Sequence, residues 1–320
     1  MSTRSLPDLT NCVMRSACAD DRAQVLDFFN QIMSHMRRTP DEYVWQYESG
    51  PAGPAELRII ECEGRIVSLY VGTRKRLWVH GRIVPCVMVQ DVMTHPDFRG
   101  RGFLNHMARS FLAEMQAAGL CGFTFPNKLS ENSFRRSGWT ELMPIPLRIA
   151  ATAIRATAAN SALEPVEQFL RDTADIWVTS GLGIGVLRDR AFLEWRYARP
   201  HAAYHRFWID GDAGYLVLKI YDRGDRRVVH ICDLVVREAA RGLLPGILEG
   251  VHAFAAEHKA ATLTCWVPDA HPYAAAFAAS GFARDRTNDR FAFVTGSPDL
   301  LPQLSRPEAW HLTQADNDLY

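Results

Sequence analysis

The chain carries one series of landmarks twice, and this repetition constrains its fold more than any other feature. An apolar, strand-like segment leads to an aspartate, Asp91 in the first copy and Asp233 in the second. An Arg-Gly pair follows eight residues after each aspartate and opens a helix with an apolar stripe. Each copy continues with a strand and a short helix, which ends at Gly138, 47 residues beyond Asp91, or at Gly281, 48 residues beyond Asp233. Such matched spacing indicates two related units in tandem.

The first copy predicts a strand, a glycine loop, a helix and a strand in that order. The first strand ends near Thr94, and the loop is Arg99-Gly100-Arg101-Gly102. Apolar residues recur at helical spacing from Leu104 to Met115, and residues 121–126 have the character of a buried strand. A strand, helix and strand in this order form a parallel crossover unit. We therefore expect a mixed α/β fold in each copy.

The glycine loop has the properties of an anion site. Glycines let backbone N–H groups approach a ligand closely. The first turn of a helix adds unpaired N–H donors and the positive end of a dipole. With Arg99 and Arg101 in the loop, these features favour a pyrophosphate. The loop lacks the third glycine of a dinucleotide-binding motif and the G-K-S/T of a phosphate-binding loop.

The loop resembles the acyl-coenzyme-A loop of the GNAT (Gcn5-related) N-acetyltransferases, whose signature is Q/R-x-x-G-x-G/A. Arg99 and Gly102 occupy its first and fourth positions, while Leu104 departs from it at the sixth. In this departure the chain resembles the multi-domain branch that contains the enhanced-intracellular-survival acetyltransferases, where R-x-R-G-L-L-like loops occur. His95-Pro96 and Gly138-Trp139 also lie where the GNAT pattern expects the ends of a strand and of a helix.

The repeat and the resemblance divide the chain into three parts. We expect an acyl-CoA-binding GNAT domain over residues 10–150, a helical bridge over 151–200 and a second GNAT-like domain over 201–320. The resemblance covers the first domain well and the second loosely. The second loop, residues 237–244, has one glycine and carries Glu238, so its cofactor site is predicted to be degenerate.

The resemblance also implies a place for each part of the donor. Backbone N–H groups near the end of the central strand would polarise the thioester carbonyl. The pantetheine arm would pair with that strand, and the pyrophosphate would rest on the loop and the first helical turn. Two asparagines after the next strand would bond the pantetheine, or serve only as a turn and a helix cap. The expected cofactor-binding residues are Val92, Met93, Thr94, Arg99, Gly100, Arg101, Gly102, Phe103, Leu104, Asn127 and Asn132.

Acyl transfer to an amine also needs a group that takes the amine proton. Asp91, at the end of the central strand, is the best-placed carboxylate. Its counterpart Asp233 in the degenerate copy leaves a shared structural role open as the alternative. In the survival-protein branch the terminal carboxylate is the base, which would be Tyr320 here. The tyrosine acid of many GNAT enzymes is replaced by Phe134, and by Phe277 in the second copy.

Two further segments resemble tandem GNAT proteins found among bacterial polysaccharide genes. One is the amphipathic helix Leu187–Tyr197, which contains Trp195-Arg196-Tyr197. The other is the ending Trp310…Asp316-Asn317-Asp318. Packing between domains is the alternative reason for both.

Composition excludes several other classes. The 36 Lys and Arg residues balance 36 Asp and Glu residues, so no net charge attracts nucleic acid or an anionic membrane. Neither a signal peptide nor a membrane-spanning segment is visible, and the spacing of metal ligands is missing. The cysteines form no C-x-x-C pair and are predicted to be buried free thiols of a cytoplasmic protein. They include Cys62, Cys86, Cys121, Cys232 and Cys265.

These observations predict an N-acyltransferase that uses acetyl-CoA and no metal, and acts on a primary amine of a small molecule. An amino sugar or a sugar nucleotide is the acceptor that the resemblance suggests. Two alternatives stay open: a non-catalytic acyl-CoA-binding or scaffold protein, and a transferase of longer acyl or aminoacyl groups. The oligomeric state also stays open, a homo-oligomer included.

Overall fold

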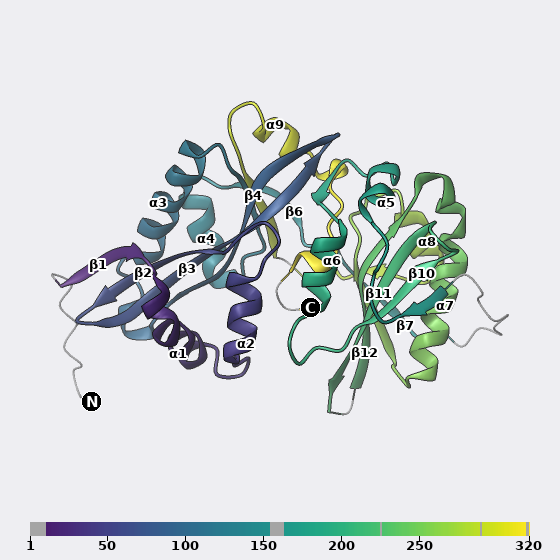
Figure 1. The fold of residues 1–320 in the computed structure, drawn as a ribbon, viewed down its shortest axis with the longest axis horizontal. Helices are drawn as coiled ribbons and strands as arrows, with labels where there is room; N and C mark the ends of the chain where they lie inside the picture. The colour runs from purple at the N-terminus through teal and green to yellow at the C-terminus, as the bar shows by residue number, and fades with distance from the viewer. Residues whose placement is uncertain (1–10, 154–162, 225, 289, 318–319) are drawn as a thin grey trace. The chain divides into compact units, whose positions relative to one another are not determined.

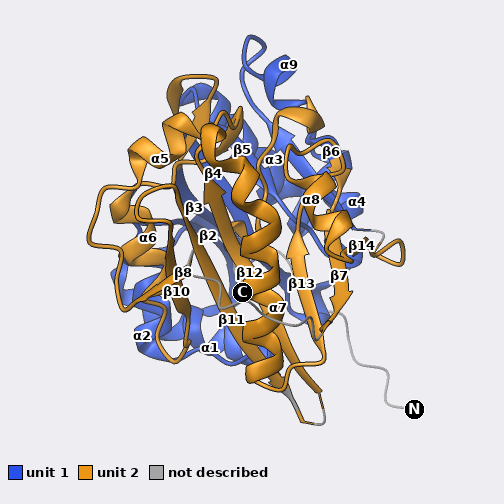
Figure 2. Cartoon of the chain, turned by 90° about the vertical axis from the view of Figure 1, so that its right-hand side faces the viewer, with its two compact units in different colours: residues 1–75, 85–142, 290–305 blue, residues 76–84, 143–289, 306–320 orange. Residues whose placement is uncertain are grey.

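The computed structural model describes residues 11–153, 163–224, 226–288, 290–317 and 320. They form two compact units whose segments alternate along the sequence (Figure 2). Unit 1 comprises residues 1–75, 85–142 and 290–305, and unit 2 comprises residues 76–84, 143–289 and 306–320. Each unit is built on a mixed sheet with helices packed against it, which confirms the predicted fold class (Figure 1).

In the sheet of unit 1, β4 and β5 form a parallel central pair. The pairs β1–β2, β2–β3 and β5–β15 are antiparallel. Its strand order is β1 (Cys12–Ser16), β2 (Glu56–Cys62), β3 (Arg65–Val79), β4 (Arg82–Thr94), β5 (Cys121–Thr124), β15 (Phe291–Thr295) and β6 (Thr140–Pro144).

Helices cover both faces of this sheet. One apolar core contains side chains of α1 (Arg22–Ile32), α2 (Pro40–Tyr43) and the π-helix Val44–Glu48 that continues α2. The other core contains the apolar stripe of α3 (Phe103–Ala117) together with Phe134 of α4 (Lys128–Arg136). The short helix α9 (Leu301–Leu304) follows β15.

Unit 2 repeats this plan. Its strand order is β14 (Ala283–Arg284), β7 (Leu147–Ala151), β13 (Thr262–Trp266), β12 (Arg226–Val236), β11 (Gly214–Arg223), β10 (His205–Ile209) and β8 (Leu163–Val166). The parallel pair is β12 with β13. The long helix α7 (Leu244–Glu257) and α8 (Ala274–Ala279) pack on one face (Figure 2).

The segment expected as a helical bridge contains strands as well as helices. Residues 163–200 include β8, α5 (Ala174–Thr179), β9 (Ile184–Val186) and α6 (Arg190–Tyr197). All of these elements belong to unit 2. Residues 154–162 lie outside the described part of the chain.

The two copies exchange one strand. In unit 1, β15 pairs antiparallel with β5, Val294 opposite Phe123, although it follows β14 of unit 2 in the sequence. In unit 2, β7 pairs antiparallel with β13, Ala150 opposite Leu263, although it follows β6 of unit 1. Each sheet is therefore completed by a segment that lies next to the other copy in the sequence.

The exchange predicts that the first copy does not fold as a contiguous fragment. A fragment of residues 11–142 lacks β15, so the backbone of β5 loses its ladder on one side and becomes an exposed edge. We expect this fragment to aggregate on expression. The same fragment joined to residues 290–305 by a flexible linker should be soluble, with a cooperative thermal transition by circular dichroism. A folded, monomeric 11–142 fragment would contradict the exchange.

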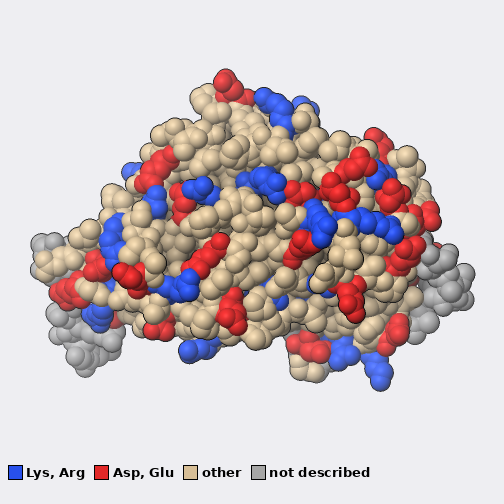
Figure 3. All heavy atoms as spheres, viewed as in Figure 1, with Lys and Arg blue, Asp and Glu red and all other residues tan. Residues whose placement is uncertain are grey.

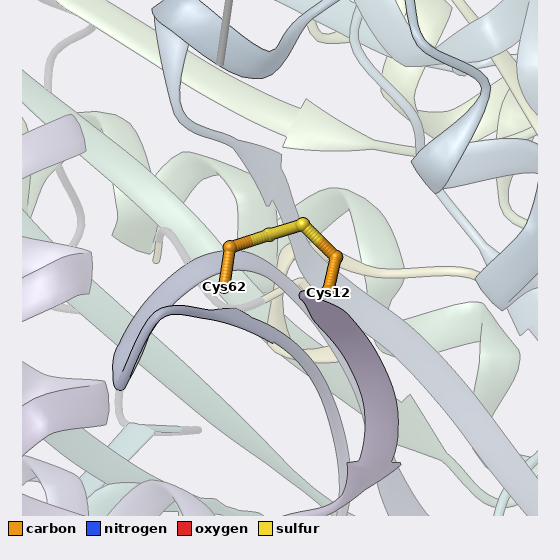
Figure 4. Close-up of a disulfide and its surroundings, with 2 residues drawn as sticks. All are labelled: Cys12 and Cys62. Atoms are coloured by element: carbon orange, nitrogen blue, oxygen red, sulfur yellow. A yellow bond between two sulfur atoms is a disulfide. The ribbon is translucent and has the colours of Figure 1, made fainter. Parts of the chain in front are cut away.

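Cys62 is not the free thiol that the sequence predicted, because it forms a disulfide with Cys12 (Figure 4). These residues are direct partners in the antiparallel pairing of β1 and β2. The pairing joins positions 50 residues apart and belongs to no local cysteine motif, so the sequence alone does not reveal it. The other four named cysteines are buried and free, as predicted: Cys86, Cys121, Cys232 and Cys265.

Acidic and basic side chains are interspersed over the face of the molecule in Figure 3, without a large area of one sign. Among the described residues, none of the helices combines the length and apolar character that a membrane-spanning helix requires. The same residues contain no group of three or more His, Cys, Asp or Glu side chains arranged to hold a metal ion.

Candidate active site

The predicted site begins where β4 and β5 separate. Their parallel pairing ends at Val89 and Thr124, while β4 continues to Thr94. Between these points Asp91 has a φ angle of 49°, in the left-handed region that aspartate tolerates better than most residues. An isolated residue of this kind in a strand is typical of a bulge, which bends the strand and interrupts its pairing. The residues after Asp91 thus run clear of β5, and we call this opening the splay.

The glycine loop leads from the end of β4 into α3. Gly100 and Gly102 have φ angles of 77° and 81°, and Gly102 is the residue before the first turn of the helix. A Cβ atom placed on either glycine would meet nothing within 4 Å. The left-handed backbone therefore requires glycine at both positions, and the space beside them is open to a ligand. This is the geometry that an anion site at a helix start needs.

The two arginines of the loop lie close to it. The guanidinium of Arg99 donates to the carbonyl of Thr94 at 3.2 Å. Within the described part of the chain, no carboxylate forms an ion pair with Arg99. The guanidinium of Arg101 lies 6.0 Å from the centre of the Phe98 ring, which in turn stacks on Phe103. Arg99 thus brings to the loop a positive charge that pairs with none of the described carboxylates.

The two predicted asparagines differ in what they do. The Oδ1 atom of Asn127 accepts hydrogen bonds from the backbone of Leu129 and Ser130, at 3.0 and 3.1 Å, and so caps α4. The cap uses the Oδ1 atom of Asn127 and not its Nδ2 group. Asn132 is exposed one turn further along α4.

Asp91 is held by two residues that the sequence analysis did not single out. Arg38 donates to both of its carboxylate oxygens, at 2.7 and 3.2 Å, and the hydroxyl of Tyr47 donates to one of them at 2.7 Å. Arg38 also donates to the Tyr47 hydroxyl at 2.6 Å. We call these three residues the Asp91 cluster. A signal for it does exist in the sequence: Tyr47 follows Arg38 at the same spacing as Tyr197 follows Arg188.

Unit 2 contains a corresponding cluster, in which the Tyr215 hydroxyl is a further donor to Asp233 at 3.1 Å. Arg188 donates to Asp233 at 2.9 Å, and the Tyr197 hydroxyl lies 3.3 Å from the same carboxylate oxygen. The register between β11 and β12 shifts beside Asp233, because the pairing passes over Cys232, so this strand is bulged, and its pairing with β13 ends at Ile231. The cluster of unit 2 is sealed, because the side chains of Arg188 and Asp233 are completely buried.

In unit 2, residues 313–316 lie beside Asp233, at the place that corresponds to the splay of unit 1. Thr313 donates to Asp233 at 3.2 Å, and Asp316 forms an ion pair with Arg188 at 2.8 Å. Gln314, beside them, donates to Thr264 of β13 at 3.0 Å, so this segment lies against both β12 and β13. The two segments that resemble tandem proteins thus meet inside unit 2, apart from Asp318, which lies outside the described residues.

Burial alone would raise the pKa of the Asp233 carboxyl. The positive charge of Arg188 opposes burial and holds that pKa well below its usual range. Asp233 is therefore a buried carboxylate that the ion pair with Arg188 keeps ionised.

The second loop is engaged by the protein itself. It forms a 3₁₀ segment, Glu238–Leu243, in which Arg241 pairs with Glu238 at 3.1 Å. Arg241 also donates to the carbonyl of Ser180 at 2.5 Å. A Cβ atom at Gly181 would lie 2.7 Å from the carboxylate of Glu238, so the segment before β9 packs tightly on this loop. Arg241 of this loop thus has a carboxylate partner, whereas none of the described carboxylates pairs with Arg99.

Tyr320 is placed by contacts within unit 2. Its main-chain oxygen accepts from Arg196 at 2.5 Å and from the Tyr204 hydroxyl at 3.1 Å. Its ring lies edge-on to those of His230 and Trp266. The other predicted site residues all belong to unit 1, where they lie on β4, in the loop, at the start of α3 and on or just before α4.

Comparison with known families supports this description of unit 1. Residues 13–141 match the sequence model of a family described as an acetyltransferase (GNAT) domain. The matched stretch contains the Asp91 cluster, the splay and the glycine loop. Comparison with curated protein sequences gave no match.

Several solved structures share the fold. A GCN5-related N-acetyltransferase from Anabaena variabilis aligns with a TM-score of 0.66 and 15% identity, over 88% of this chain and 72% of that one. An Enterococcus faecalis protein of unknown function, titled a probable N-acyltransferase, gives 0.64 and 12%, over 90% and 73%. Eis1 from Mycobacterium abscessus gives 0.52 and 16%, over 79% and 64%. At these identities the likeness establishes the GNAT fold.

Proposed function

We propose that the protein is an N-acyltransferase that takes an acetyl group from acetyl-CoA and transfers it to a primary amine of a small molecule. One observation carries the proposal. Unit 1 combines an opened central strand with a glycine loop that faces open space at the start of a long helix. In unit 2, Thr313 contacts Asp233 on the central strand, and the loop residue Arg241 donates to the carbonyl of Ser180, so protein groups engage both of the corresponding places. We therefore assign the donor to unit 1.

In this assignment each part of acetyl-CoA has a partner. The diphosphate rests on the N–H groups from Arg99 to Leu104, which the two glycines leave accessible. The pantetheine arm lies along the backbone of Val92–Thr94 and reaches the Nδ2 group of Asn127, with Asn132 beside it. Backbone N–H groups at Val92 and Met93 polarise the thioester carbonyl, where negative charge develops during transfer.

For the proton of the amine, the candidates are Asp91 and Tyr320. Accepting a proton would cost Asp91 its ion pair with Arg38. The sequence allows Asp91 to be either a base or a structural residue. The contacts of Asp91, and those of its counterpart Asp233, favour the structural role. An oxygen of Tyr320 already accepts from Arg196 and Tyr204 in unit 2. We accordingly propose that the proton leaves through water, with Asp91 shaping the site.

The acceptor class rests on resemblance alone, and an amino sugar or sugar nucleotide is the proposal to test first. Transfer of longer acyl or aminoacyl groups is a variant of the same chemistry at the same donor site. A non-catalytic acyl-CoA-binding role is favoured by one observation: Phe134 and Phe277, at the positions of the usual tyrosine acid, are buried in apolar cores.

Two measurements test the proposal. Isothermal titration of the full chain with acetyl-CoA should show one site per chain. Coenzyme A release, followed by chromatography over a panel of amino sugars, sugar nucleotides and other primary amines, should depend on the amine. Chromatography is preferred to a thiol reagent because the exposed Cys18 would react with the reagent. Binding without release for any amine would favour the non-catalytic role, and no binding would overturn the proposal.

A further inference from the structure

We propose that Arg38 and Tyr47 are positioning residues of the acyl-CoA site. They hold the carboxylate of Asp91 and thereby keep β4 bulged, so that Val92–Thr94 stay separated from β5. This inference rests on the function proposed above. It adds two residues, from outside the strand and the loop, that control donor affinity.

The Asp91 cluster joins three separate elements of unit 1. Arg38 comes from the segment between α1 and α2, Tyr47 from the π-helix that continues α2, and Asp91 from β4. π-Helical turns within helices occur frequently at functional sites. Asn30 of α1 fixes Arg38, since it accepts from the Arg38 backbone N–H at 2.7 Å and donates to its carbonyl at 3.0 Å. Arg38 is therefore a rigid support and not a flexible surface arginine.

The support matters because the backbone of Asp91 is in an unfavourable conformation. A left-handed φ angle costs a non-glycine residue about 1–2 kcal/mol, so surrounding contacts must hold it in place. Here both carboxylate oxygens are bound, and bidentate arginine contacts fix the plane of a carboxylate. Val92 packs in the core beneath α3 and Met93 in the core beneath α1, so the backbone after the bulge is anchored on both faces. A change at Asp91 is thus passed directly to the strand that would contact pantetheine.

Unit 2 provides an internal control. Its cluster has the same residue types beside a register shift of β12, but the side chains of Arg188 and Asp233 are completely buried. In unit 1 the side chains of Arg38 and Asp91 remain 8% and 7% exposed. The same hydrogen bond can therefore be removed once beside the proposed site and once in a sealed core.

The test compares Tyr47→Phe with Tyr197→Phe in the full chain. Each substitution removes one hydroxyl from a cluster and keeps the ring. Tyr47→Phe should weaken coenzyme A binding by about tenfold in isothermal titration, because a hydrogen bond to a charged group is lost beside the donor. Without ligand, the amides of residues 92–94 should also exchange faster with deuterium. Tyr197→Phe should lower the melting temperature and leave both quantities unchanged.

Asp91→Asn separates this role from that of a base. Asparagine tolerates the same backbone conformation but loses the charge that Arg38 holds, so coenzyme A should bind more weakly. If Asp91 were only a base, turnover would fall and affinity would stay. If Tyr47→Phe bound coenzyme A with wild-type affinity, or if Tyr197→Phe lost as much affinity as Tyr47→Phe, the inference would be wrong and the proposed function would stand. Failure of the wild-type protein to bind coenzyme A would overturn the proposed function, and the inference with it.

Discussion

Replacing Arg188 with methionine is expected to lower the free energy of unfolding by about 3–5 kcal/mol. Arg188 is completely buried and neutralises two carboxylates, Asp233 at 2.9 Å and Asp316 at 2.8 Å. Methionine fills much of the volume but leaves both acids buried without a cation. Removing one partner of a buried ion pair in this way is among the most destabilising single changes in a protein.

The pH dependence distinguishes this mechanism from simple loss of packing. In the wild-type protein the pKa of Asp233 is lower in the folded than in the unfolded chain, so its stabilisation is complete above about pH 4 and is lost below it. In Arg188→Met, protonation of one buried acid relieves the repulsion. The difference in stability between the two proteins should therefore shrink as the pH falls. Urea denaturation from pH 4 to pH 8 measures it.

A surface arginine provides the control. Arg227 pairs with Asp222 at 2.6 Å, but both side chains are exposed, at 40% and 62%. Arg227→Met should change stability much less, because solvent screens this pair. If the two arginine variants were equally stable, or if the Arg188 effect did not depend on pH, the account of the buried cluster would be wrong.

Replacing Gly102 with glutamate is expected to weaken acetyl-CoA binding by about 100-fold or more. Charges a few ångströms apart near a protein surface repel by about 4 kcal/mol, and 1.4 kcal/mol corresponds to tenfold in affinity. The side chain would also enter the open space beside the loop, where a Cβ atom now meets nothing within 4 Å. The fold should survive, because nothing in the protein occupies that space.

Two controls isolate the cause. Gly102→Ala carries the same strain at φ 81° without the charge, so it should bind acetyl-CoA more tightly than the glutamate variant. Gly242→Glu places the same charge on the loop of unit 2, at a glycine that also faces open space. It should leave affinity unchanged. Unchanged affinity in Gly102→Glu, or a large loss in Gly242→Glu, would show that the donor does not bind in unit 1.

Local sequence patterns predicted the parts of the fold that local physics determines. The spacing of apolar residues gave α3, and the glycines gave the turn before it, because periodicity and left-handed conformations leave a direct trace in a sequence. The matched aspartates indicated two related units. Asp91 has a left-handed φ angle of 49° in β4, and the register of β12 shifts beside Asp233.

Features that depend on distant pairing were missed. The exchange of β7 and β15 leaves the order of elements unchanged and alters only which sheet each strand joins. The Cys12–Cys62 disulfide joins strands 50 residues apart. In the sequence, Arg38 precedes a helix start and Tyr47 resembles a core aromatic residue. Only their shared contact with Asp91, far along the chain, shows that they act together. In each case the missing information was a contact between residues that no short motif connects.

The central claim is that the glycine loop of unit 1 holds the diphosphate of the acyl donor. A crystal structure of the full chain with coenzyme A tests it most directly. We predict the diphosphate against the backbone N–H groups of residues 100–104 and the pantetheine arm along residues 92–94. Coenzyme A bound instead at residues 237–244 of unit 2, or elsewhere in the chain, would contradict the account.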